Sequence, residues 1–249
     1  MSAAAFLACV LIGFVAGVIN VLAAGGSFLT LPLLLFLGLP ASVANGTNRV
    51  GIVTQNITAA LGFHRHRVLD WRWALAVSVP ALIGAGLGVW AALNIPEIAF
   101  RRILSLAMLS VTLWTLLRSS TSSTSGSATR SPWHWTMMLG FFVVGLYGGF
   151  LQAGVGFLTL AITSVAGLDL VRGNAIKVFT MSLLTLLSVA IFAGTGNVDW
   201  PVGLALALGN LVGGLVGVRV AVLRGHKWLE RVLTATVILF AIMLWIGDR

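Results

Sequence analysis

The sequence is poor in charged residues, and acidic residues are the scarcest. Only 8% of its 249 residues are charged, whereas soluble domains carry roughly 25%. Six residues are acidic, fifteen are basic and 59% are hydrophobic, with a mean hydropathy of +1.04. Such a chain cannot cover a water-facing surface. Its apolar runs exceed the roughly 10-residue strands of an outer-membrane barrel, so we expect an all-α polytopic membrane protein.

The chain also lacks the residue patterns of enzymes and metal sites. Cys9 is the only cysteine, which excludes an intramolecular disulfide and a cysteine metal cluster. There is no His-Glu-x-x-His, no phosphate-binding loop and no Ser/His/Asp set at membrane depth. We therefore expect no enzyme activity, no catalytic residue, no metal and no cofactor. The net charge of +9 gathers at segment ends, which indicates contact with lipid headgroups, not nucleic acid.

Glycine, by contrast, is abundant, and it interrupts the apolar runs at two related places. Residues 25–32 read GGSFLTLP, and 129 residues further on residues 154–160 read GVGFLTL. Glycine and proline both weaken a helix here, and freed backbone groups persist in a membrane only where protein or a water-filled cavity satisfies them. Paired glycine breaks in two halves are typical of a transporter's binding site.

The same offset relates other uncommon residues and predicts two repeats. The first transmembrane repeat is expected at 1–117, a Ser/Thr-rich flexible linker at 118–132 and the second repeat at 133–249. The Asp-Trp pairs at the starts of segments are expected to cap the helices that follow. The residues that match at this offset include Asn45 and Asn174, Asp70 and Asp199, Trp71 and Trp200, Gly84 and Gly213, and Arg102 and Arg231.

The distribution of basic residues predicts that the repeats are inverted. The loop at 64–72 carries three arginines, whereas its counterpart at 194–200 carries no basic residue. Since cytoplasmic loops hold the excess of Lys and Arg, equivalent loops lie on opposite sides and both termini are expected outside. Each repeat would contain about four to five hydrophobic helical segments, with the glycine-broken segment near its start, crossing or re-entrant. The last two segments are expected at 201–222 and 231–246.

Polar residues near the two breaks predict a binding site for a small anion. Arg49 and Lys177 lie near the starts of equivalent helices, and no acidic residue is expected at membrane depth, so a cation would lack a counter-charge. Helix N-termini at the breaks would add N–H donors. Amides that merely bridge helices and cations that reach a headgroup are the simpler alternatives. The expected substrate-binding residues are Gly25, Gly26, Ser27, Thr30, Asn45, Thr47, Asn48, Arg49, Gln152, Gly154, Gly156, Asn174 and Lys177.

These motifs, together with GFVAG at 13–17, ANGTN at 44–48, GNVDWP at 196–201 and GGLVGVR at 213–219, resemble those of the TauE/SafE family of sulfite-exporter-like permeases. The resemblance covers nearly the whole chain apart from the linker. It implies a multi-pass transporter in the bacterial inner membrane for small anions, often sulfite, sulfoacetate or other organosulfonates. The chain departs from the family at residues 174–177, which read NAIK where such proteins usually show a Gly-Thr pair after the alanine.

We therefore expect a permease or exporter of a small anion that works by alternating access around a central site formed by both repeats. An anion channel is one alternative, and its uptake would not saturate. A membrane-embedded structural or assembly subunit without transport activity is another. A homo-oligomer is compatible with the sequence, which leaves the anion, the direction of transport and any coupling ion open.

Overall fold

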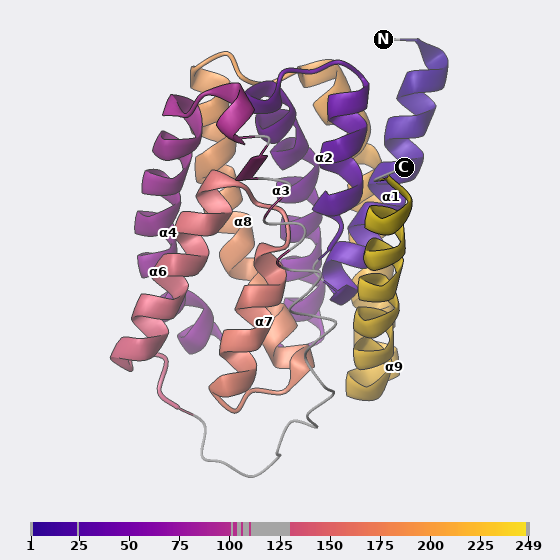
Figure 1. Ribbon diagram of the computed structural model, residues 1–249. Helices are drawn as coiled ribbons and strands as arrows, with labels where there is room; N and C mark the ends of the chain where they lie inside the picture. The colour runs from indigo at the N-terminus through magenta and orange to yellow at the C-terminus, as the bar shows by residue number, and fades with distance from the viewer. Residues whose placement is uncertain are drawn as a thin grey trace.

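The computed structural model describes residues 2–23, 25–100, 102–103, 106, 110 and 130–247, with side chains up to Arg224 except at Ala23. In this part of the chain it consists of helices joined by turns and short loops. The linker and the expected segment at 99–117 fall largely outside this part. The prediction of an all-α protein is confirmed. Its helices are α1 (Ala3–Ala23), α2 (Ser27–Phe36), α3 (Ala41–Arg65), α4 (Trp71–Asn94), α6 (Trp135–Phe150), α7 (Val155–Val165), α8 (Leu170–Gly194) and α9 (Trp200–Gly247) (Figure 1).

Four of the described helices are long and apolar enough to cross a membrane. They cover Ala3–Leu22, Trp71–Asn94, Leu170–Gly194 and Trp200–Arg224. The outer face of α4, with Leu75, Ile83 and Trp90, is exposed and apolar, as contact with lipid requires. The protein is thus a multi-pass membrane protein. Helix α9 runs from Trp200 to Gly247 and so covers both segments expected at 201–222 and 231–246.

Helices α2 and α7, which follow the glycine breaks, are too short to cross a bilayer. They contain 10 and 11 residues, or about 15 and 17 Å at roughly 1.5 Å per residue, against a hydrocarbon core of about 30 Å. In Figure 1, α6 rises from the end of the molecule opposite the N-terminus, and α7 descends again beside it. Helices α1 and α2 form the corresponding hairpin from the other end. The segments after the breaks are therefore half-length helices that turn back.

The two halves of the chain are interleaved. Helix α1 packs along α9, α4 packs along α6, and the polar α3 packs against α8 between them. Suppose that α1, α2, α3 and α4 exchange places with α6, α7, α8 and α9, respectively. The α1–α9 contact then becomes the α6–α4 contact, and the α3–α8 contact stays the same. Most of the packing therefore joins one half to the other, and α3 and α8 carry the buried polar side chains of the centre.

Equivalent glycines allow close helix contacts in both halves. A Cβ atom at Gly84 of α4 would collide with the carbonyl oxygen of Phe142, and one at Gly213 of α9 would collide with that of Phe14. Only glycine permits this backbone approach, which is typical of helix pairs in membranes. The paired glycines found in the sequence thus mark matching contacts, α4 with α6 and α9 with α1.

Candidate functional site

The second break reverses the chain through residues with left-handed backbone conformation. Helix α6 ends at Phe150, and α7 begins at Val155. Gln152 has a φ of 66° and Gly154 a φ of 73°. Glycine adopts this conformation freely, whereas for glutamine it costs on the order of 1 kcal/mol. The buried Gln152 must therefore be held in place by its surroundings.

Side chains of α3 satisfy the carbonyl groups that the end of α6 leaves free. Arg49 donates from Nη1 to the carbonyl oxygen of Gly148 at 3.0 Å and from Nη2 to that of Gly149 at 2.6 Å. Asn45 donates to the carbonyl oxygen of Phe150 at 2.9 Å. These last carbonyls have no partner within the helix, and in a membrane interior only protein groups or a wet cavity can replace water.

The two terminal nitrogens of Arg49 make further contacts, while its Nε has no hydrogen-bond partner among the described residues. Nη1 donates to Oε1 of Gln152 at 3.0 Å, and Nη2 donates to Oδ1 of Asn45 at 3.3 Å. The ring of Phe192 lies over its Cζ, 5.1 Å from the ring centroid. Tyr147 closes the turn by donating to the carbonyl oxygen of Ala153 at 2.7 Å. The positive charge of the fully buried Arg49 therefore stabilises the negative end of α6 and anchors the break.

Lys177 of α8 does the same at the first break, from the other half of the chain. Its Nζ donates to the carbonyl oxygens of Asn20 and Val21, at 2.8 and 3.2 Å, in the last turn of α1. The Asn20 side chain donates to Gln55 at 2.9 Å, and Gln55 donates to Asn56 at 3.1 Å. The two buried cations are thus placed at the C-terminal ends of two different helices and are not brought together.

A small cavity of about 10 Å³ lies between the two breaks, which is room for about one water molecule. Ser27 and Val155 begin α2 and α7, so the N-termini of both short helices border this one space. The lining offers amide, hydroxyl, ammonium and backbone N–H donors and no carboxylate. Its residues are Asn20, Ser27, Asn56, Gln152, Val155, Gly156, Lys177 and Met181.

Four of the expected substrate-binding residues line this cavity, namely Ser27, Gln152, Gly156 and Lys177. Residues Gly25, Gly26 and Gly154 shape the breaks, and Asn45 and Arg49 hold α6. The others lie in separate polar contacts. Thr30 donates to Asn48 at 2.6 Å, and Thr47 accepts from the backbone N–H of Asp199 at 2.8 Å. The buried Oδ1 of Asn174 and Nδ2 of Asn48 have no hydrogen-bond partner in the described part of the chain.

The expected substrate-binding residues did not include the cavity residues Asn20, Asn56, Val155 and Met181. The two asparagines had a usable signal, since each is an amide within a helix and Asn20 lies just before the first glycine break. Val155 and Met181 are apolar residues among many. Only the packing of α7 and α8 brings them to the cavity.

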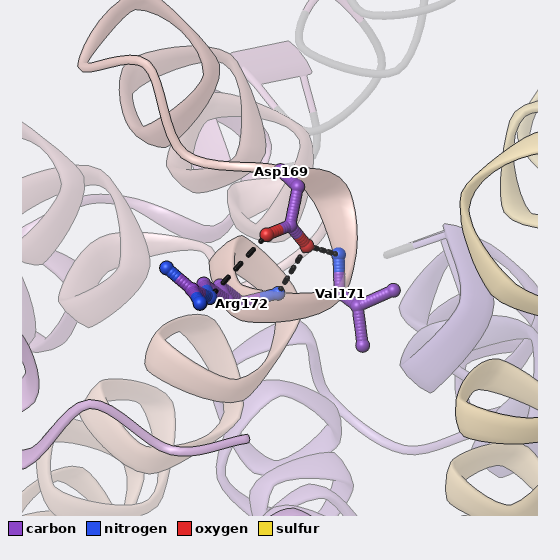
Figure 2. A network of polar contacts seen from close by, with 3 residues as sticks. All are labelled: Asp169, Val171 and Arg172. Carbon is purple, nitrogen blue, oxygen red and sulfur yellow. Dashed lines mark hydrogen bonds and ion pairs between the residues drawn. The ribbon is translucent and has the colours of Figure 1, made fainter. Parts of the chain in front are cut away.

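Three aspartates cap helices, and none of them lines the cavity. Asp70 accepts from the backbone of Trp73, so the predicted cap of α4 is confirmed. Asp199 caps α9 in the same way. Figure 2 shows the third cap, in which Asp169 accepts from the backbone N–H groups of Val171 and Arg172 at 2.9 and 3.0 Å and pairs with the Arg172 side chain. Among the described residues, the cavity is therefore bordered by a cation without a carboxylate.

Comparison with known proteins gives a consistent result. The family model described as sulfite exporter TauE/SafE matches residues 9–244. A probable membrane transporter protein, ORF9 of Sinorhizobium sp., is 28% identical over 232 residues, which cover 93% of this chain and 88% of the relative. A probable membrane transporter protein of Haemophilus influenzae is 28% identical over 225 residues, covering 89% and 86%. The probable membrane transporter protein YfcA of Escherichia coli K12 is 24% identical over 220 residues, covering 87% and 80%. No solved structure matches the chain.

Proposed function

The chain belongs to the sulfite exporter TauE/SafE family, and from this premise we propose that it transports a small anion across the bacterial inner membrane. The observation that carries the proposal is the central cavity, where Lys177, three amides and the first residues of α2 and α7 meet without a carboxylate. Helix N-termini and charged donors bind oxyanions. The ligand class that fits best is sulfite or an organosulfonate such as sulfoacetate, whose several oxygens can accept from donors on all sides.

We further infer that the protein works by alternating access. The cavity lies between two helical hairpins that enter from opposite ends of the molecule, and the exchange of packing partners described above supports two inverted repeats. Rocking of one repeat against the other would open the site to one side at a time. A cavity of about 10 Å³ favours such a closed intermediate over an open channel, which needs a continuous aqueous path.

Uptake by proteoliposomes containing the purified protein tests this function. Radiolabelled sulfite uptake is expected to saturate, and unlabelled sulfoacetate, thiosulfate or taurine is expected to reveal which head group competes. Protein-free liposomes give the background. Arg72→Gln, at an exposed arginine that does not line the cavity, gives a variant control. Uptake that rises linearly with concentration would indicate a channel. Absence of uptake for every anion tested would contradict a transport function.

A further inference from the structure

The two buried cations differ in whether they reach the cavity. Both terminal nitrogens of Arg49 donate to two acceptors each, and Phe192 covers the guanidinium plane. Nε of Arg49 has no hydrogen-bond partner among the described residues, but Arg49 is absent from the cavity lining. Lys177 does line the cavity, and its ammonium donates to the carbonyl oxygens of Asn20 and Val21. An ammonium has a third N–H, for which the described residues provide no acceptor.

We propose that Lys177 is the side chain that binds the anion's charge, that it does so while still attached to the end of α1, and that anion binding thereby moves the α1–α2 hairpin. Arg49 is a positioning residue, which keeps the α6–α7 hairpin fixed. This inference rests on the proposed function, because it names the residue that recognises the anion in the same cavity.

Competition between acceptors explains why α1 responds. The carbonyl groups of α1 are neutral acceptors, whereas an anion adds direct charge–charge attraction to its hydrogen bond with the ammonium. An anion in the cavity therefore draws the Lys177 ammonium away from the carbonyls of Asn20 and Val21, which lie 2.8 and 3.2 Å from it. The end of α1 must follow or lose its donor. Nothing equivalent happens at α6, because its carbonyls are held by Arg49 and Asn45, which do not border the cavity.

The native cysteine, Cys9, can be used to measure movement of α1. Cys9 is the only cysteine of the sequence, and it is fully buried on α1 in one core cluster with Val202 and Leu206 of α9. Met137 of α6 is the matched position. It is buried in one cluster with Trp73 and Val77 of α4, the residues 129 positions before Val202 and Leu206. A thiol at each position therefore reports on one hairpin.

The experiment measures alkylation of these thiols by N-ethylmaleimide in the purified protein, with and without sulfoacetate, which does not itself react with maleimide. One sample contains native Cys9. The other carries Cys9→Ala with Met137→Cys. Sulfoacetate is expected to change the rate at Cys9 by about threefold or more, as a population shift between two states would, and to leave the rate in the Met137→Cys variant unchanged.

Variants of Lys177 separate charge from folding. Lys177→Gln keeps donors for the α1 carbonyls but removes the charge, so it is expected to weaken sulfoacetate binding at least about tenfold and to abolish the response of Cys9. Lys177→Arg keeps the charge and is expected to restore part of both effects, which loss of a purely structural residue would not allow.

Two results would overturn the inference. One is an equal response at both thiols, and the other is a Cys9 response that persists in Lys177→Gln. Saturable sulfoacetate uptake with no change at either thiol would also overturn it while leaving the proposed function standing. Absence of uptake for every anion would reject the proposed function itself, and this inference with it.

Discussion

The two glycine breaks answer one physical demand in two ways. At each break a helix ends inside the membrane protein, and its last carbonyls need donors that lipid cannot supply. A cation from the other half of the chain supplies them, Arg49 at the end of α6 and Lys177 at the end of α1. The guanidinium lies outside the cavity lining, with both terminal nitrogens bonded, whereas the ammonium borders the cavity. On our proposal, similar backbones combine one fixed hairpin with one that responds to a ligand.

The largest expected effect concerns the α6–α7 hairpin, which Arg49 is proposed to keep fixed. Arg49→Met removes the donors for the carbonyl oxygens of Gly148 and Gly149 and for Gln152. An unsatisfied buried acceptor costs roughly 1–3 kcal/mol, so we expect a loss of about 3 kcal/mol or more in stability. Thermal unfolding in detergent, followed by size-exclusion chromatography, measures this loss.

Two variants serve as references for Arg49→Met. Arg72→Met, at an exposed arginine, should unfold near the wild-type temperature. Lys177→Met should be destabilised less than Arg49→Met, because Lys177 serves only two acceptors. If Arg49→Met unfolds like the wild type, Arg49 does not hold the α6–α7 hairpin, and the two breaks do not differ in the way proposed.

The next effect tests where the two halves should behave alike. Gly84→Ala and Gly213→Ala each place a methyl group against a backbone carbonyl of the neighbouring helix. Overpacking costs typically 1–3 kcal/mol, and we expect similar losses from the two variants. Gly86→Ala is the control, because a Cβ there meets no atom within 4 Å. It should be neutral or slightly stabilising. Unequal losses, measured by the same unfolding assay, would show that the packing of the halves is not equivalent.

Much of this arrangement could be predicted because it depends on short sequence patterns. Glycines at 25–26 and at 154 and 156 break apolar runs, and Gly84 and Gly213 recur at a fixed offset. Ser27 and Lys177 were predicted for the same reason, as polar residues next to a break or inside an apolar helix. The half-length of α2 and α7 could not be predicted, since an apolar run fits a crossing or a hairpin equally well.

What the sequence could not provide is the partner of each polar group. Arg49 bonds to residues 99 to 103 positions away, and Lys177 to residues 156 and 157 positions away. Those pairings depend on which helix lies opposite α3 or α8. A cation near an apolar boundary has the same local sequence pattern whether it binds a ligand or a helix end. Arg49 and Lys177 were therefore both predicted to bind the anion.

A smaller effect concerns a side-chain hydrogen bond within the turn, which the structure describes only at the second break. Tyr147→Phe removes the hydroxyl that donates to the carbonyl oxygen of Ala153 at 2.7 Å. We expect a loss of about 1 kcal/mol, the typical net value of one hydrogen bond, with faster hydrogen exchange in the turn at 151–154. Sulfoacetate affinity should stay within about twofold of the wild type, because the fixed hairpin is not the responsive one. A large loss of affinity would make the second break part of the response.

The smallest effect decides which end of α3 faces the substrate. Thr47→Val keeps the shape of the side chain but removes the acceptor for the backbone N–H of Asp199. Membrane-protein hydrogen bonds average about 0.6 kcal/mol, so stability should fall by about that amount and anion affinity should not change. Ser27→Ala, in the cavity lining, should do the reverse and weaken sulfoacetate binding about two- to fivefold, the value of one hydrogen bond. Isothermal titration compares the two. A larger loss of affinity in Thr47→Val than in Ser27→Ala would instead place the site at the cavity of about 120 Å³ near Ser42 and Asn197. Thr47 reports on that cavity because Asn197 and Asp199 lie in the same loop against α3.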